Sequence, residues 1–301
     1  MNYDLVGIGN ALVDIEVRVD PGFIEQLGLR KGGMTLTTAE EQRRILDLLP
    51  HQPTKISSGG SAANTVHGLS VLGGSAYYLG RVANDEYGRH YTEDMKTCGV
   101  GFPGPGTESE GTGTCLVLIT PDTERTMMTH LGVSAGLHPD NVDETILRFA
   151  KTVYIEGYLW TGEETRQAAV KMAETAQRNK IPVAFTLSDT FVVDLDREAL
   201  DDFIRWHVDI LFCNEPEARA MTGEDDTERA FAMLRGMADT VFLTRGDRGS
   251  WGGNQSGEKH ETRAFPITAV DTTGAGDLYA AGVLHALIQG FGLKDAAAIG
   301  S

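Results

Sequence analysis

Residues 152–187, TVYIEGYLWTGEETRQAAVKMAETAQRNKIPVAFTL, contain the alternation of patterns that decides the fold class. The apolar runs at residues 152–155 and 182–187 are typical of buried strands. Between them, residues 163–178 carry apolar side chains at helical spacing. A strand, a helix and a second strand in this order form a βαβ unit whose strands are parallel. The stretch therefore predicts an α/β fold with a mainly parallel sheet flanked by helices.

The same alternation extends in both directions along the chain. Further strands are predicted at residues 3–9, 76–82, 208–213, 240–244, 250–253 and 260–267. Further helices are predicted at residues 38–49, 64–72, 87–97, 141–150, 198–206, 227–237 and 275–289. No internal repeat and no linker rich in proline, glycine or serine interrupts the series. We therefore expect a single α/β domain over residues 1–301.

One region departs from the alternation. Residues 114–120 and 125–129 are both strand-like and are separated only by a short turn, so they predict a β-hairpin with no helix between its strands. We expect a small β-sheet lid built from segments near residues 15–37 and 111–130. Because the edge of such a sheet can pair with a second copy, a homodimer formed through the lid is a further expectation.

The composition excludes several classes of protein. With 43 acidic and 26 basic residues the formal charge is -17, so the surface repels phosphate groups and neither a nucleic acid nor an anionic membrane is expected as a partner. Hydrophobic residues make up 41% of the chain, enough for a large core, yet no stretch approaches the ~20 apolar residues of a membrane span. The first residues lack the basic segment of a signal peptide, and three widely spaced cysteines do not suggest a disulfide framework. We therefore expect a cytoplasmic protein.

Glycine is unusually frequent, with 36 residues in 301 against a usual share of ~7%, and the glycines gather in clusters. The most informative cluster is DTTGAGD at residues 271–277, which follows a predicted strand and opens a predicted helix. The unshielded N–H groups at such a helix start, together with the helix dipole, favour an anion. Asp277 would then serve as a general base beside a transferring phosphoryl group. The alternative is that Asp277 only stabilises the first turn of the helix.

This string resembles the C-terminal signature of the ribokinase-like (PfkB-type) carbohydrate kinase family. Residues 58–74, SGGSAANTVHGLSVLGG, resemble the family's other signature, so the resemblance runs over essentially the whole chain. It implies a ribokinase-like fold and transfer of a phosphoryl group from ATP to a primary hydroxyl. By this analogy Asp277 is the base, and the N–H groups of Gly274, Ala275 and Gly276 form the hole that stabilises the developing negative charge.

Two segments are candidates for binding the phosphoryl acceptor. Gly59 and Gly60 would let the backbone approach a sugar, and the amide of Asn64 offers both a donor and an acceptor, although a tight strand-to-helix turn explains them as well. The family resemblance also places Asn10 and Asp14 on sugar hydroxyls, which a carboxylate binds well. A surface acid at a strand end is the alternative for Asp14. The G-x-G that precedes these two residues lacks the third glycine of a dinucleotide-binding fingerprint.

The resemblance assigns the nucleotide and its metal ion to other strand ends. Asn214 and Glu217 are similar to the family's Asn-x-x-Glu motif, which tunes Mg²⁺ and phosphate binding, usually through water. A capping box explains the same two residues locally, and both explanations can hold together. Thr244, Gly246 and Gly249 resemble the family's nucleotide-phosphate turn.

Four more residues are weaker candidates. Ser188 ends a predicted strand at the same sheet edge and would neighbour the nucleotide. Asp271 matches a position that lies near a monovalent cation in some family members, which implies K⁺ as a further cation. Arg245 would offset phosphate charge or be solvated in its turn, and Arg125 would either reach over a bound substrate or lie exposed on the hairpin.

The identity of the acceptor rests on two short stretches. Residues 9–14, GNALVD, and 156–160, EGYLW, look most like bacterial adenosine-kinase-like members of the family, so a nucleoside is the predicted acceptor. A sugar such as ribose, fructose or 2-keto-3-deoxygluconate is the alternative, and an aromatic face near the lid would favour a nucleobase. A noncatalytic sensor of nucleotides or sugars is a third hypothesis, but it predicts erosion of the base or of the glycine turn, and both are intact.

Overall fold

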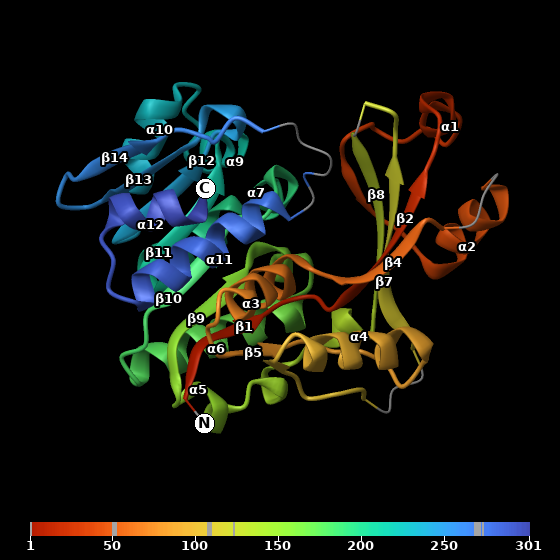
Figure 1. Ribbon diagram of the computed structural model, residues 1–301, viewed down its shortest axis with the longest axis horizontal. Coiled ribbons are helices and arrows are strands. Elements are labelled where there is room, and N and C mark those ends of the chain that lie inside the picture. The colour runs from red at the N-terminus through yellow and green to blue at the C-terminus, as the bar shows by residue number, and fades with distance from the viewer. Residues whose placement is uncertain (1, 50–52, 107–109, 123, 268–271, 273) are drawn as a thin grey trace.

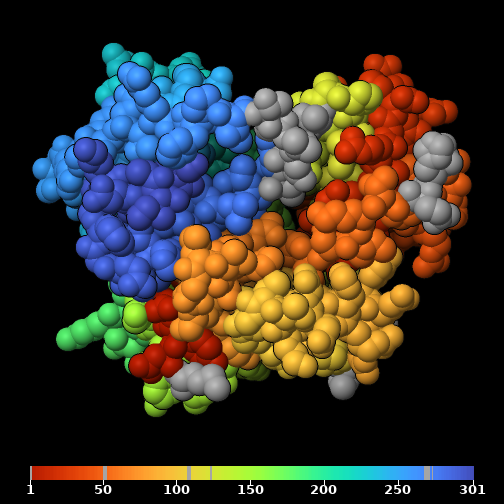
Figure 2. All heavy atoms as spheres, in the orientation of Figure 1, coloured from red at the N-terminus to blue at the C-terminus, as the bar shows by residue number. Residues whose placement is uncertain are grey.

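The framework of the molecule is a pair of sheets of unequal size. The computed structural model describes residues 2–49, 53–106, 110–122, 124–267, 272 and 274–301. The two sheets belong to separate lobes that lie side by side (Figure 1). In the space-filling view, the lobe of the smaller sheet is red, orange and yellow, and it stands beside the blue C-terminal half (Figure 2).

The larger sheet confirms the predicted α/β fold. Its nine strands are β1 (Tyr3–Ile8), β5 (Ala76–Leu79), β6 (Val100–Gly101), β9 (Ala150–Glu156), β10 (Val183–Thr186), β11 (Ile210–Asn214), β12 (Thr240–Thr244), β13 (Ser250–Asn254) and β14 (Lys259–Thr262). They lie in the order β14-β13-β12-β11-β10-β9-β1-β5-β6. The pairs from β12 to β6 are parallel, whereas β13 pairs antiparallel with both β12 and β14.

Strand β1 lies at the point where the order of the strands reverses. Ile8 pairs with Leu79 of β5 on one side and with Ile155 of β9 on the other. The chain therefore proceeds from β1 first to one side of the sheet and later to the other. The carboxyl edge at such a reversal is where open α/β sheets bind ligands.

Helices cover both faces of the larger sheet (Figure 1). They are α3 (Ser61–Val71), α4 (Glu86–Thr97), α5 (Glu144–Leu147), α6 (Glu163–Arg178), α7 (Thr190–Leu195), α8 (Arg197–His207), α9 (Glu215–Thr222), α10 (Thr227–Leu234), α11 (Ala275–Ile288) and α12 (Leu293–Gly300). Val6 and Ile8 of β1 are buried against the group that includes α6, α8 and α10, whereas Leu5 is buried with α3, α4, α11 and α12. This alternation is the period of two that a strand imposes on its side chains.

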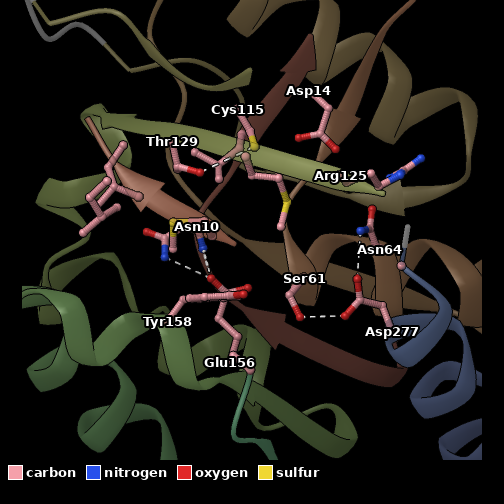
Figure 3. A pocket seen from close by; sticks show the side chains of 18 of the residues that line it. Asn10, Asp14, Ser61, Asn64, Cys115, Arg125, Thr129, Glu156, Tyr158 and Asp277 are labelled. Carbon is pink, nitrogen blue, oxygen red and sulfur yellow. Dashed lines mark hydrogen bonds between the residues drawn. The ribbon is translucent and has the colours of Figure 1, made fainter. Parts of the chain in front are cut away.

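The smaller sheet has one covered face and one face that looks toward the larger sheet. It consists of β2 (Leu12–Arg18), β3 (Met34–Leu36), β4 (Lys55–Gly59), β7 (Thr112–Ile119) and β8 (Arg125–Gly132), in the order β3-β8-β7-β2-β4. The helices α1 (Pro21–Gln26) and α2 (Ala39–Leu48) pack on its outer face through residues such as Ile15, Leu116 and Ile45. Asp14 and Cys115 pair across β2 and β7 and lie on its inner face (Figure 3). We call this sheet with α1 and α2 the lid.

Several elements differ from those expected, for local reasons. Strand β4 was not predicted, because its sequence KISSG is small and polar and has no apolar alternation. The helix predicted at residues 141–150 is limited to α5 in the structure, because its N-cap is Asp143 and Ala150 already belongs to β9. The short helices α7 and α12 were also missed, and of α9 only the capping box at its start was predicted. The predicted strand at 260–267 ends at Thr262.

Two further expectations concern pairing of the lid with a second copy and the absence of a membrane span. Strands β3 and β4 form the edges of the lid sheet, so pairing of this sheet with a second copy stays a prediction. Among the helices that the structure describes, none combines the length and the apolar character needed to cross a membrane.

Candidate active site

Two cavities meet at the carboxyl edge of the larger sheet. The larger, of about 450 Å³, lies between the inner face of the lid and the ends of β1 and β9 (Figure 3). The smaller, of about 210 Å³, lies at the ends of β10, β11 and β12. Both cavities are lined by Ser61, Ser188, Thr272, Gly274 and Asp277. A molecule in one cavity would therefore touch a molecule in the other at these residues.

Asp277 lies at this junction, in the first turn of α11. Gly274 precedes the helix in the left-handed region (φ +66°), where glycine is favoured, and it brings the carboxyl to the cavity border. Burial raises the pKa of Asp277 to about 6, although hydrogen bonds from Asn64 and Ser61 act to lower it. A carboxyl with this pKa is largely ionised at neutral pH and still basic enough to accept a proton.

The first turn of α3 holds Asp277 through three donors. The Ser61 hydroxyl donates to Asp277 Oδ1 at 2.7 Å, and the Asn64 amide donates to Oδ2 at 2.9 Å (Figure 3). The Thr65 hydroxyl also donates to the backbone carbonyl of Asp277, at 3.2 Å. Asn64, predicted to contact the acceptor, thus lines the larger cavity while binding the candidate base.

The glycine turn before α11 lines the smaller cavity, as an anion site requires. Gly274, Ala275 and Gly276 all border it. A Cβ at Gly276 would meet no atom within 4 Å, so this backbone is open to a ligand. The N–H of Ala275 donates to the carbonyl of Thr272 at 3.2 Å in this structure. Asp271, the predicted neighbour of a monovalent cation, lies outside the described residues.

Asp14 faces the larger cavity from the lid, with Arg125 nearby on β8 (Figure 3). Burial and the neighbouring Glu16 raise the pKa of Asp14 to about 7, against the lowering effect of Arg125 and Lys55. The side chain of Asp14 fills the space beside Gly59, where a Cβ would collide with its carboxylate. Gly59 therefore makes room for Asp14, and it is not among the described residues that line the cavity.

Gly60 and Asn10 approach each other at the floor of the same cavity. Gly60 has φ +101°, and a Cβ there would collide with the carbonyl oxygen of Asn10, so both conformation and space require glycine. The side chain of Asn10 is buried and donates to Glu156 Oε1 at 3.0 Å, while its oxygen accepts from the Ser134 hydroxyl at 3.1 Å. Both Gly60 and Asn10 line the larger cavity, and their contact with the acceptor stays a prediction.

Glu156 is a member of this site that sequence reasoning did not assign. It ends β9, is buried and lines the larger cavity, and burial raises its pKa to about 7. Its partners are the backbone and side chain of Asn10 and the N–H of Ala62. The available signal was an acid directly after the apolar run at residues 152–155, because a charged residue at a buried strand's carboxyl end lies on the ligand edge.

The smaller cavity receives the predicted pair Asn214 and Glu217. They form a full capping box at the start of α9: each side chain accepts from the other's backbone N–H, at 2.9 and 3.0 Å. Glu217 nevertheless lines the cavity, and burial raises its pKa to about 7. No lysine or arginine lines this cavity within the described part of the chain, so the donors nearest to an anion there would be backbone N–H groups and hydroxyls.

The residues predicted to bind or neighbour the nucleotide separate into two groups. Thr244 ends β12 and lines the smaller cavity, and Ser188 lines both cavities. Ser188 has φ +70°, an unfavourable conformation for serine, while its hydroxyl accepts from the N–H of Gly157 at 2.9 Å. Gly246 and Gly249 have positive φ in the turn between β12 and β13, and neither is among the described residues lining the cavities.

Arg245 in this turn is not solvated, as one alternative had it. Its guanidinium lies over the ring of Trp251, with 4.3 Å between its central carbon and the ring centroid, and it pairs with Glu261 at 3.0 Å. Its side chain is only 12% exposed, and Glu215 lies beside it. These contacts hold the guanidinium against β13 and β14, and Arg245 is not among the described residues that line the smaller cavity.

An aromatic side chain and an apolar surface shape the remaining wall of the larger cavity. Tyr158 lines it on the side of β9 (Figure 3). The ring of Phe191 lies beside it, at 6.0 Å between ring centroids. Across the cavity, the inner face of the lid contributes Leu12, Met34, Leu36, Met127 and Leu131. The larger cavity therefore has an apolar part as well as the polar floor around Asn10.

Comparisons with known proteins show the family to which the chain belongs. A model described as the pfkB family carbohydrate kinase matches residues 38–301. The chain is 28% identical to the adenosine kinase of Saccharomyces cerevisiae over 98% of its own length and 91% of that protein. It is 32% identical to the guanosine-inosine kinase of Escherichia coli over 81% of its length, which spans just over half, 58%, of that relative.

Two further similarities bear on the acceptor and on the fold. The chain is 30% identical to the 5-dehydro-2-deoxygluconokinase of Halalkalibacterium halodurans over 81% of its length and 77% of that protein. The crystal structure of adenosine kinase from Sinorhizobium meliloti matches it with a TM-score of 0.95 and 36% identity, over 100% of this chain and 92% of that one.

Proposed function

Because the chain belongs to the pfkB family of carbohydrate kinases, phosphotransferases that act on nucleoside or sugar hydroxyls, we propose that it phosphorylates the primary hydroxyl of an adenosine-like nucleoside with ATP. The observation that carries the proposal is the position of Asp277. Its carboxyl borders both cavities, so an acceptor in the larger cavity and the phosphates in the smaller one would meet there.

In this reaction Asp277 is the proposed base. The hydroxyl oxygen forms a bond to the γ-phosphorus as the bond from that phosphorus to the bridging oxygen breaks, and ADP leaves with the electron pair of the broken bond. The hydroxyl proton passes to the carboxylate of Asp277, whose pKa of about 6 suits the task. The N–H groups at Gly274, Ala275 and Gly276 would stabilise the negative charge on the transferring group, since they open α11 on the smaller cavity. For this the N–H of Ala275 has to turn from the Thr272 carbonyl to the phosphoryl group.

The smaller cavity also fits a magnesium ion. The oxygens of Glu217 and Asn214 already accept hydrogen bonds within the capping box, including one from the Asn214 amide to Glu217 Oε1 at 2.7 Å. These two residues would therefore hold Mg²⁺ through its retained water, as suits this ion. When bound, Mg²⁺ supplies positive charge to the phosphates that no described lysine or arginine of this cavity provides. We assign Ser188 and Thr244 to the same phosphates, and K⁺ near Asp271 remains a separate proposal.

The larger cavity supports a nucleoside better than a plain sugar. Asn10 and Gly60 at the floor and Asp14 on the lid offer polar groups to the hydroxyls of a ribose. The ring of Tyr158 and the apolar inner face of the lid offer the remaining space to a flat base. A sugar alone would leave this apolar part unfilled. The match to a 5-dehydro-2-deoxygluconokinase keeps a sugar or a sugar derivative as the alternative acceptor.

A panel of acceptors with ATP and Mg²⁺ tests the proposal. Adenosine, inosine and guanosine are compared with ribose, fructose, 2-keto-3-deoxygluconate and 5-dehydro-2-deoxygluconate, by ADP formation and by mass of the product. We expect a nucleoside phosphorylated at its primary hydroxyl, and Asp277→Asn to lose about 10²–10⁴-fold in turnover while ATP still raises the unfolding temperature. Phosphorylation of a sugar but of none of the nucleosides would contradict the proposed nucleoside acceptor. Stabilisation by a ligand without any turnover would indicate a sensor.

A further inference from the structure

Glu156 is a buried acid of the larger cavity to which the proposed reaction gives no task. It is 1% exposed, and both of its carboxylate oxygens are used. Oε1 accepts from the backbone N–H of Asn10 at 2.7 Å and from its side-chain amide at 3.0 Å, and Oε2 accepts from the N–H of Ala62 at 2.8 Å. The carboxylate at the end of β9 thereby joins the end of β1 to the start of α3 (Figure 3).

The N-cap residue of helix α3 provides no side-chain hydrogen bond to the helix. This residue is Gly60, which has no side chain to accept from the first free N–H groups. Ala62 stands at the second position of the helix, whose N–H is one that an N-cap side chain usually binds. Glu156 supplies this acceptor from a different element, and its ionised form places a negative charge at the positive end of the helix. Gly9 makes room for it, because a Cβ at Gly9 would collide with Glu156 Oε2.

The capped turn is the same turn that holds Asp277. Ser61 precedes Ala62 and donates to one carboxylate oxygen of Asp277, and Asn64 donates to the other. A shift of this turn would move both donors at once. The position of Asp277 at the border of the two cavities therefore depends on how firmly the start of α3 is held.

We propose that Glu156 is a positioning residue, which fixes the first turn of α3 and through it the orientation of the Asp277 carboxyl. The inference rests on the proposed role of Asp277 as the base. Glu156 does not itself exchange a proton with the acceptor in this proposal. It acts on turnover only through Ala62 and the two donors beside it.

Glu156→Gln tests the proposal with little change in volume. Glutamine retains one oxygen for Asn10 but replaces the other by an amide, which cannot accept from the N–H of Ala62. We expect kcat to fall at least tenfold and the KM for ATP to change less than twofold. Thr152→Val is the matched control, since it removes a buried hydroxyl from the same strand, and we expect its kcat to stay within twofold of the parent.

A double-mutant cycle separates positioning from a merely structural role. Because Glu156 acts through the donors on Asp277, Glu156→Gln combined with Ser61→Ala should lose little more turnover than the more damaging single change. Losses that multiply would overturn the proposal. So would a Glu156→Gln protein that matches Thr152→Val in kcat, or one in which only the KM for the acceptor rises. Thermal unfolding of each variant confirms that all assays use folded protein.

Asp277→Asn in the same series distinguishes the two proposals. If Asp277→Asn retains turnover, the proposed base is wrong and the inference falls with it. If Asp277→Asn is inactive while Glu156→Gln and the cycle behave as independent changes, only the positioning role of Glu156 is wrong.

Discussion

Removal of the Ser61 hydroxyl should shift the pH dependence of the reaction in a calculable way. The hydroxyl donates to Asp277 Oδ1 at 2.7 Å, and this bond lowers the pKa of a carboxyl that burial otherwise raises. In Ser61→Ala the ionised form of Asp277 loses this stabilisation while the protonated form loses less. The pKa of the base should therefore rise.

The size of the shift follows from the strength of the lost bond. A hydrogen bond to a charged group contributes roughly 1.5 kcal/mol at the lower end of its range, and about 1.36 kcal/mol corresponds to one pKa unit. The pKa of Asp277, about 6 in the parent, should thus rise by about one unit. At pH 6.5 the ionised fraction would fall about threefold, from ~0.76 to ~0.24, whereas above pH 8.5 the two proteins would differ little.

The assay is kcat/KM for the acceptor between pH 5 and pH 9, because this parameter reports the ionisation of the free enzyme. Ser70→Ala is the matched control: it lies on the same helix, but its hydroxyl donates to the carbonyl of Cys98. We expect the acid limb to move only in Ser61→Ala. An acid limb at the same pH in both variants, or a loss in Ser61→Ala that is uniform over pH, would refute the assignment of this limb to Asp277.

Four further predictions concern stability and ligand binding. The buried carboxyls that line the two cavities have raised pKa values of about 6 to 7, so between about pH 4 and 7 the folded chain binds more protons than the unfolded chain. The free energy of unfolding should therefore fall as the pH rises through this range. Thermal unfolding should show a higher midpoint at pH 5.5 than at pH 8, and the opposite order would contradict this prediction. Gly60→Ala should destabilise the fold by about 1–3 kcal/mol and reduce turnover, because φ is +101° and a Cβ would collide with Asn10. Gly257→Ala is the control: with φ +96° and open space around it, this variant should be strained but keep its turnover. Glu217→Gln should raise the Mg²⁺ concentration needed for half-maximal rate by about 10-fold, as expected for loss of a supporting carboxylate, with the KM for the acceptor unchanged as the internal check. Tyr158→Ala should weaken a nucleoside acceptor by roughly 1–3 kcal/mol in kcat/KM, as base stacking is worth, and an equal effect on ribose would show that the ring does not contact a base.

The local turns of the site were predictable because their chemistry is contained in short stretches. DTTGAGD places a glycine at the start of a helix and an acid in its first turn, and the structure has Gly274 and Asp277 in these positions. The capping box of Asn214 and Glu217 likewise needs only four consecutive residues. In both cases the sequence window that determines the geometry is no longer than one helical turn.

The contacts that assemble the site could not be predicted from short stretches of sequence. Glu156 binds Asn10 and Ala62, which are 146 and 94 positions away in the sequence. Nothing in the neighbourhood of any one of these residues specifies the other two. The same limit applies to Arg245, whose turn suggested either contact with phosphate or a solvated side chain. Its partners in the structure lie on β13, on β14 and at the start of α9. Strand β4 was missed because its position is set by pairing with β2 rather than by its own composition.

The way in which the lid is assembled has a consequence for how the protein folds. Its central pair joins β2 to β7, and Asp14 lies opposite Cys115, about 100 positions later in the chain. Contacts between residues so distant in sequence form slowly, because a long loop must be closed before they add any stability. In the larger sheet the pairing of Ile8 on β1 with Ile155 on β9 closes a still longer loop. Because the acceptor cavity lies between the lid and the ends of β1 and β9, we expect it to form only after both of these distant pairings are made. A newly made chain would then acquire its acceptor site only at a late step, well after most of its helices are formed.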